Sequence, residues 1–219
     1  DPPAAPARHR LWGGRFEEGP APTLDALNRS LPIDVRLWPE DIEVSRAWVE
    51  ALEGAGVLDP AERAALDRGL ARVADRLAAA DPAALAAGPD EDVHTLVERL
   101  LYEEVGALAG KLHTGRSRND QAATGTRLWA LRTGARLDRE LRDLAAALVD
   151  QATRTVDLLM PAYTHLRRAQ PVRVAHWLLA HAWPLLRDRE RLAQALERTA
   201  VLPLGSGAIA GSGFPIDRE

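Results

Sequence analysis

The sequence predicts an all-α protein, with an N-terminal helical domain followed by part of a bundle of long helices. Alanine, leucine, arginine and glutamate dominate the composition, and aromatic residues reach only 5%, which favours helix over sheet. No segment shows the alternation of a β-strand of useful length. The stretch 119–157 contains no proline and repeats leucine at helical spacing, which indicates one helix far longer than average.

Several shorter helices are expected in the first half of the chain. Patterns of apolar residues favour helices at 23–30, 34–55 and 90–112. Another helix opens at Pro60, because proline suits a first turn in which the missing N–H has no partner. The apolar face of that helix repeats at Leu66, Leu70, Val73 and Leu77.

Two long helices are expected in the second half. The first, at 119–157, would span roughly 55–60 Å at ~1.5 Å per residue, and a second is expected at 171–200 with a kink at Pro184. The seam of the first is formed by Leu137, Leu141, Leu144 and Leu148. Two such helices cannot bury their apolar stripes against each other alone, so further helices or other subunits are required.

The expected organisation has three parts. Residues 1–10, rich in proline and alanine, are expected to form a disordered tail, 11–112 an N-terminal helical domain, and 113–219 the first part of a central helical bundle domain. The glycine-rich segment 205–213 is expected to be a loop rather than an end. The chain is therefore expected to be truncated within the bundle domain.

The composition excludes several classes of protein. Hydrophobic residues make up 46% and charged residues 27%, as in a soluble globular protein. No cysteine is present, which excludes disulfides and thiolate metal sites and agrees with a reducing, cytoplasmic location. No apolar run has membrane-spanning length, and no basic cluster is interleaved with aromatic residues, so neither a membrane nor a nucleic acid is expected as a partner.

A polar segment, His113–Gln121, lies just before the longest expected helix. Gly115 permits a tight turn, while Arg116 and Arg118 offer planar forks that suit carboxylates. The helix start adds free N–H groups and a positive dipole end, which together can bind an anion. The alternative is an elaborate N-cap, with Asn119 or Asp120 as the capping residue.

A second polar segment, Tyr163–Pro171, is expected as a loop or short turn between the long helices. It contains His165, which can exchange a proton near neutral pH. A lone histidine is more often a structural hydrogen-bonding residue, and this alternative is stronger for His176 and His181 on the next helix. No set of histidines and carboxylates has the spacing of a metal site, and no phosphate-binding glycine loop or nucleophile elbow is present.

Two further segments allow both a structural and a functional interpretation. Pro89–Thr95 places acidic residues around a helix start, where they suit the dipole, although His94 could face a cleft. Asn28–Asp34 is a polar break between helices with the same two interpretations.

Taken together, these segments resemble argininosuccinate lyases, which belong to the fumarase/aspartase superfamily. The matches fall in the family's order and cover nearly the whole chain after the tail. The segments at His113 and Tyr163 are specific to this lyase rather than to fumarases, aspartases or adenylosuccinate lyases. The matching segments are Leu11–Phe16, Asn28–Ser30, Asp90–Thr95, His113–Gln121, Tyr163–His165 with Arg168–Pro171, and Leu202–Gly211.

The resemblance implies a fold and a set of site residues. It implies a long-helix bundle of the fumarase/aspartase type, assembled as a homotetramer whose active sites each gather segments from three subunits. It implies that His165 is the catalytic histidine, with Thr164 beside it, and that no cofactor or metal takes part. The residues implied to contact substrate are Ser30, Asn119 and Thr164, with Asp34, Ser117, Arg118 and Gln170 as neighbours.

The implied reaction is the β-elimination of argininosuccinate to arginine and fumarate, in arginine biosynthesis. A proton leaves the carbon next to a carboxylate, giving a dianionic aci-carboxylate, and the guanidino nitrogen then departs. Preorganised N–H groups, hydroxyls and amides would stabilise that charge. The proton transfers would be shared between the histidine matched by His165 and a serine on a mobile loop.

Two departures and two alternatives remain. The family's later Gly-Ser-Ser-x-Met-Pro-x-Lys loop, which carries the serine, is absent, so the 219-residue chain alone is expected to be inactive. Arg167 stands where the family usually has glutamine. One alternative is a non-catalytic structural homologue like the crystallins of this family; the other is a related lyase, such as one acting on adenylosuccinate.

Overall fold

The computed structural model describes residues 21–218 and divides into two compact units. One unit contains residues 21–126 together with 202–218, and the other runs from Arg127 to Val201. The expected tail at 1–10 and the matching segment Leu11–Phe16 lie outside the described residues. The domain boundary expected at 112 stays a prediction.

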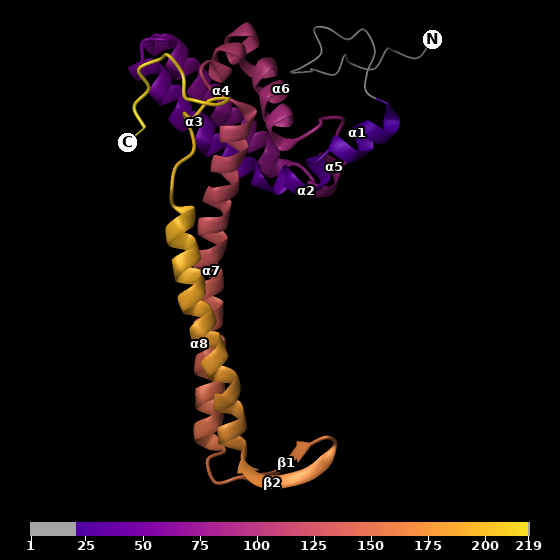
Figure 1. The fold of residues 1–219 in the computed structure, drawn as a ribbon. Helices are drawn as coiled ribbons and strands as arrows, with labels where there is room; N and C mark the ends of the chain where they lie inside the picture. The colour runs from indigo at the N-terminus through magenta and orange to yellow at the C-terminus, as the bar shows by residue number, and fades with distance from the viewer. Residues whose placement is uncertain (1–20, 219) are drawn as a thin grey trace. The chain divides into compact units, whose positions relative to one another are not determined.

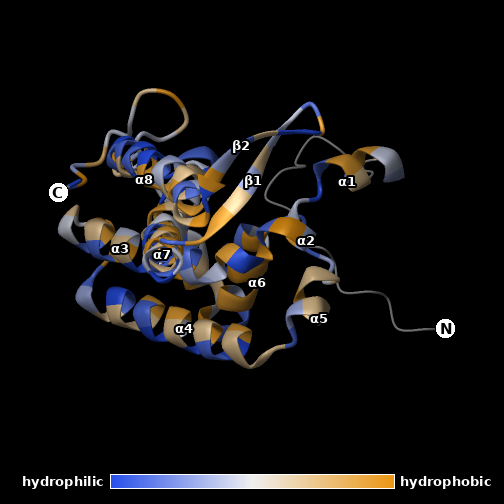
Figure 2. Ribbon diagram, turned by 90° about the horizontal axis from the view of Figure 1, so that it is seen from below, coloured by the Kyte–Doolittle hydropathy of each residue, from blue (hydrophilic) through white to orange (hydrophobic). Residues whose placement is uncertain are grey.

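The first unit is a layered arrangement of short and medium helices. Its elements in order are α1 Pro22–Asn28, α2 Leu31–Asp34, the 3₁₀ helix η1 Val35–Leu37, α3 Trp38–Gly54, α4 Pro60–Ala79, α5 Pro82–Ala86, α6 Val93–Val105 and the 3₁₀ helix η2 Gly106–His113. It also contains the start of the longest helix, α7 Arg118–Arg154. Helices α3, α4 and α6 each present hydrophobic and hydrophilic positions (Figure 2), as helices with one buried face do.

The core of this unit lies where α3, α4 and α6 meet. The predicted apolar face of α4 is fully buried, with Leu66, Leu70 and Val73 at 0% exposure. Helices α4 and α6 approach closely at Gly69, where a Cβ atom would lie 2.7 Å from Val105 Cγ1 and would have to displace it. Fully buried side chains from the other helices complete the core, including Leu31, Trp48, Leu52, Val93 and Leu101.

Helix ends in this unit follow local rules. The side chain of Asp59 accepts a hydrogen bond from Glu62 N at 2.8 Å, and the side chain of Glu62 accepts one from Asp59 N at 3.2 Å. Helix α4 therefore begins with a capping box, and Pro60 follows the capping residue Asp59. The single helix expected at 90–112 is wrong in extent. Helix α6 ends at Val105 because Gly106 adopts φ 60°, and η2 follows it.

The second unit consists of two long helices joined by a β-hairpin (Figure 1). Helix α7 leads to β1 Leu159–Thr164 and β2 Arg167–Arg173, and α8 Val174–Thr199 follows. The strands pair antiparallel, with Pro161 opposite Pro171 and Thr164 opposite Arg167. None of the described helices is long and apolar enough to span a membrane.

The hairpin overturns the expectation that no strand is present and that 163–171 is a loop running into a helix. His165 and Leu166 form a two-residue turn with φ 51° and 62°, the left-handed geometry that matches strand twist. The usual signal for such a turn is asparagine or glycine, and this sequence has neither at the two positions. Pro161 and Pro171 are tolerated in these strands because each strand of a two-stranded sheet has a free edge, where a missing N–H leaves no partner unpaired.

The long helices pack along one side and leave the other side open. Ala152, Ala175 and Leu178 form a small buried cluster between α7 and α8, with Leu148 and Val174 against it. Leu137 and Leu144 of the predicted seam are 43% and 51% exposed. Part of the apolar stripe is therefore uncovered within this unit. Helix α8 continues through Pro184, and the expected kink there stays a prediction.

Candidate active site

The start of α7 is shaped by hydrogen bonds that close its first turn. Ser117 is the capping residue: its Oγ accepts a hydrogen bond from Asn119 N at 3.2 Å, and its own N–H donates to Asp120 Oδ1 at 3.0 Å. The expectation of Asn119 or Asp120 as the cap was therefore wrong. Asp120 instead occupies the third helical position, from which a carboxylate reaches back to the cap. The side chain of Asn119 is left exposed.

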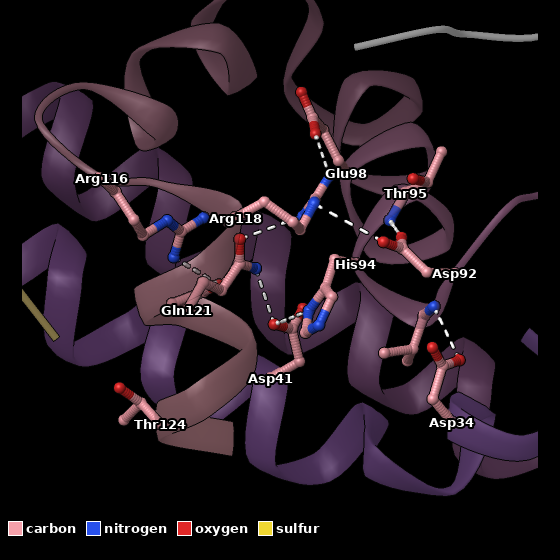
Figure 3. A network of polar contacts seen from close by, with 12 residues as sticks. Asp34, Asp41, Asp92, His94, Thr95, Glu98, Arg116, Arg118, Gln121 and Thr124 are labelled. Atoms are coloured by element: carbon pink, nitrogen blue, oxygen red, sulfur yellow. Dashed lines mark hydrogen bonds and ion pairs between the residues drawn. The ribbon is translucent and has the colours of Figure 1, made fainter. Parts of the chain in front are cut away.

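Arg118 joins the start of α7 to the start of α6 (Figure 3). Its Nη2 donates to Glu98 Oε2 at 3.4 Å, and its Nε lies 3.6 Å from Asp92 Oδ2. Its Nη1 donates to Gln121 Oε1 at 3.0 Å. Because the guanidinium faces two carboxylates and an amide, it is held in one orientation.

Asp41, on α3, is the centre of a buried network beneath this site. Its Oδ1 accepts hydrogen bonds from His94 Nδ1 and Gln121 Nε2, each at 2.7 Å. Burial would raise the pKa of Asp41, but the His94 ring, the Arg116 guanidinium and these hydrogen bonds together hold that pKa below its ordinary value. The carboxylate is therefore ionised at neutral pH, and it connects α3, α6 and α7.

Arg116 supplies positive charge to the same network. Its guanidinium is enclosed, and this burial lowers the pKa of Arg116 to about 10 although Asp41 opposes the shift. Its Nη1 donates to Ser45 Oγ at 3.3 Å. Burial, with Arg116 and Arg118 nearby, also lowers the pKa of His113. That ring is therefore neutral at pH 7.

Ser30 and Asp34 lie beside the first turn of α6. Ser30 Oγ donates to Asp34 Oδ2 at 2.5 Å, and Val93 N donates to Asp34 Oδ1 at 3.0 Å. Burial raises the pKa of Asp34 against the effect of these two hydrogen bonds, and the nearby Asp92 contributes in the same direction. The backbone N–H groups of Ser30 and Leu31 both donate to Glu91 O, which fixes α2 against the segment leading into α6.

Four of the predicted site residues thus gather around two helix starts in the first unit. Asp34 accepts a hydrogen bond from Val93 in the first turn of α6, and Ser30 donates to Asp34. Ser117 and Arg118 form the start of α7, which Arg118 joins to α6. Helix starts carry partial positive charge, so this arrangement can stabilise an anionic ligand. Asn119 lies at the same helix start with its side chain available.

The other predicted site residues lie in the hairpin of the second unit. Thr164 ends β1, His165 occupies the turn, and Gln170 lies in β2; all three are exposed. His165 adopts a φ of 51°, in the left-handed region. This backbone conformation raises the free energy of a non-glycine residue by of order 1–3 kcal/mol, and such residues are found preferentially at functional sites. Leu166 beside it is 98% exposed. The hairpin therefore presents His165 to solvent at its tip.

Asp41 and Gln121 support the site but were not predicted from the sequence to do so. Asp41 lies at the beginning of the stripe that continues through Val44, Trp48 and Leu52, all of which are buried. A carboxylate at a core position of an amphipathic helix is the signal that could have found it. Among the described residues, no group of three or more histidine, aspartate or glutamate side chains could hold a metal ion.

The fold defines the chain as an all-α protein of the long-helix bundle class, with one small β-hairpin and a polar site at its helix starts. Residues 14–219 match the model of a family described as lyase. The chain belongs to this lyase family and corresponds to an N-terminal part of the fumarase/aspartase superfamily fold.

Individual relatives agree with this assignment. The chain is 53% identical over 208 residues to an argininosuccinate lyase of Roseiflexus castenholzii, covering 95% of this chain and 45% of the relative. It is 47% identical to an argininosuccinate lyase of Chlamydomonas reinhardtii, covering 99% and 46%. A solved structure of EDDS lyase in complex with formate is 31% identical with a TM-score of 0.71, covering 92% and 40%. The chain thus spans about half the length of the curated relatives it matches.

Proposed function

We propose that this chain is the N-terminal part of an argininosuccinate lyase, a carbon–nitrogen lyase of arginine biosynthesis in the cytoplasm. The reaction is the elimination of arginine from argininosuccinate to give fumarate, without a cofactor or metal. The identity of 53% over 208 residues with a curated argininosuccinate lyase supports this choice of substrate. The single structural observation behind it is that Ser30, Asp34, Ser117 and Arg118 gather around the starts of α6 and α7.

The start of α7 suits the most demanding step of that reaction. Removal of the proton next to a carboxylate places a second negative charge on that carboxylate. The amide N–H donors of the exposed Asn119 side chain, at the positive end of α7, would stabilise it. The Asp41 and Arg118 networks hold this helix start rigidly, so the donors need little reorganisation as the charge develops.

His165 is the proposed acid or base, with Thr164 and Gln170 as substrate contacts. Its exposed position at the tip of a tight turn allows it to enter a site formed with another copy of the chain. We therefore propose a homotetramer in which each site combines segments from three subunits. The uncovered apolar residues of α7 and α8, such as Leu137 and Leu144, support such association.

The test is a fumarate-release assay on two proteins. The 219-residue chain alone should give no turnover, and a protein that continues it to the length of its relatives should convert argininosuccinate. Turnover by the short chain would refute the first statement. Conversion of adenylosuccinate instead would identify another lyase of the superfamily, and conversion of neither substrate by the long protein would favour a structural, crystallin-like role.

A further inference from the structure

The glycine-rich loop that follows α8 is folded tightly on itself. Gly205, Gly207 and Gly211 adopt φ values of 88°, 62° and 84°, which side chains rarely permit. Gly211 N donates to Ser206 O at 2.6 Å. A Cβ atom on Gly207 would lie 2.8 Å from the carbonyl oxygen of Gly211, so this close approach requires glycine.

The loop directs two backbone donors at one side chain of α7. The N–H groups of Gly205 and Gly207 donate to Asp120 Oδ2 at 3.2 and 2.7 Å. The other oxygen of the same carboxylate accepts the N–H of Ser117, and Asp120 is 5% exposed. Converging backbone N–H groups of this kind form a nest, a concavity that binds anions. Here the nest holds a carboxylate of the protein itself.

We infer that Asp120 is a positioning residue, which holds the start of α7 against the glycine-rich loop. Its carboxylate joins 205–207 to the cap of the helix that presents Asn119. Without the carboxylate, three buried or half-buried N–H groups lose their acceptor and the helix start is no longer fixed. The effect on turnover rests on the proposed lyase function, whereas the effect on the loop does not.

The experiment is chemical rescue of Asp120→Gly in the protein continued to the length of its relatives. We expect kcat to fall roughly 10²-fold with a smaller change in KM, because displaced donors mainly affect the transition state. Formate can enter the space left by the side chain and restore part of kcat, whereas chloride at the same ionic strength cannot. Asp143→Gly is the matched control, since Asp143 lies on the exposed side of α7 and, among residues 21–218, pairs only with Arg142. The unmodified protein with formate measures any direct inhibition.

A second measurement reports on the loop independently of activity. In the 219-residue chain, hydrogen exchange of residues 203–211 should become faster in Asp120→Gly, slow again with formate, and stay unchanged in Asp143→Gly. An unchanged kcat in a folded Asp120→Gly protein overturns the inference. So does a hydrogen-exchange rate of the loop that changes with neither the substitution nor formate. An unmodified long protein without lyase activity would instead refute the proposed function, and the exchange result would then decide alone whether Asp120 holds the loop.

Discussion

Removal of the Asp41 carboxylate tests how the start of α7 is supported. Asp41→Ala removes the acceptor shared by His94 Nδ1 and Gln121 Nε2, both 2.7 Å away. It also removes the negative charge near the enclosed guanidinium of Arg116. Breaking a buried charged network in this way costs about 3–5 kcal/mol, against a typical total unfolding free energy of about 5–15 kcal/mol.

The measurement is urea denaturation followed by circular dichroism at a fixed protein concentration, in which the midpoint falls while the slope is retained. Asp67→Ala is the matched control. Asp67 pairs with Arg46 at 2.7 Å, but the two side chains are 36% and 50% exposed. Exposed pairs contribute about 0–1 kcal/mol, so this substitution should lower the unfolding free energy by no more than that.

The dependence on pH gives a second test of the same residue. The pKa of Asp41 is lowered in the folded protein from its ordinary value of 3.8. Its stabilising contribution is therefore present above that value and is lost as the pH falls through the lower, folded pKa. The difference between the unmodified chain and Asp41→Ala should shrink on acidification below pH 3.8. A loss below about 1 kcal/mol at pH 7, or a difference that grows in acid, would refute the reasoning.

Three further predictions concern packing, the hairpin turn and catalysis. Gly69→Ala should lower the unfolding free energy, measured in urea, by about 1–3 kcal/mol, because a Cβ atom there lies 2.7 and 2.9 Å from side-chain atoms of Val105 and Leu101. An unchanged unfolding free energy would mean that α4 and α6 can move apart at no cost. Leu166→Asn should raise the thermal midpoint, since asparagine tolerates the φ of 62° better, and a lower midpoint would contradict the assigned turn. His165→Asn in the continued protein should reduce turnover by roughly 10²-fold, and an unchanged rate in the fumarate assay would leave His165 without an acid–base role.

Much of the helical architecture could be predicted because its signals are local. The apolar spacing of α4 from Leu66 to Leu77 and the proline at its first turn both lie within one short segment. The hairpin could not be predicted in this way. Its turn depends on His165 and Leu166 taking a backbone conformation that neither residue prefers, so the surrounding strand pairing rather than local preference determines it.

The site could be predicted only in part for a related reason. Ser117, Arg118 and Asn119 adjoin one another in a polar segment at a helix start, and that pattern is visible in the sequence. The hydrogen bonds that hold this helix start in place are not visible in the sequence, because Asp41 bonds His94 and Gln121 across separations of 53 and 80 residues. The core position of Asp41 within α3 is a local signal, but no short-range pattern identifies the side chains that its carboxylate joins, and only the tertiary fold brings them together.

The uncovered apolar side chains of the second unit have a consequence for how the protein is handled. Trp177 and Trp183 on α8 are 48% and 62% exposed, and Leu159 at the start of β1 is 70% exposed. If copies of the chain associate as proposed, contacts that cover such groups stabilise the folded form by mass action. The midpoint of thermal melting should therefore rise with protein concentration, and dilute samples would lose structure at temperatures that concentrated samples withstand.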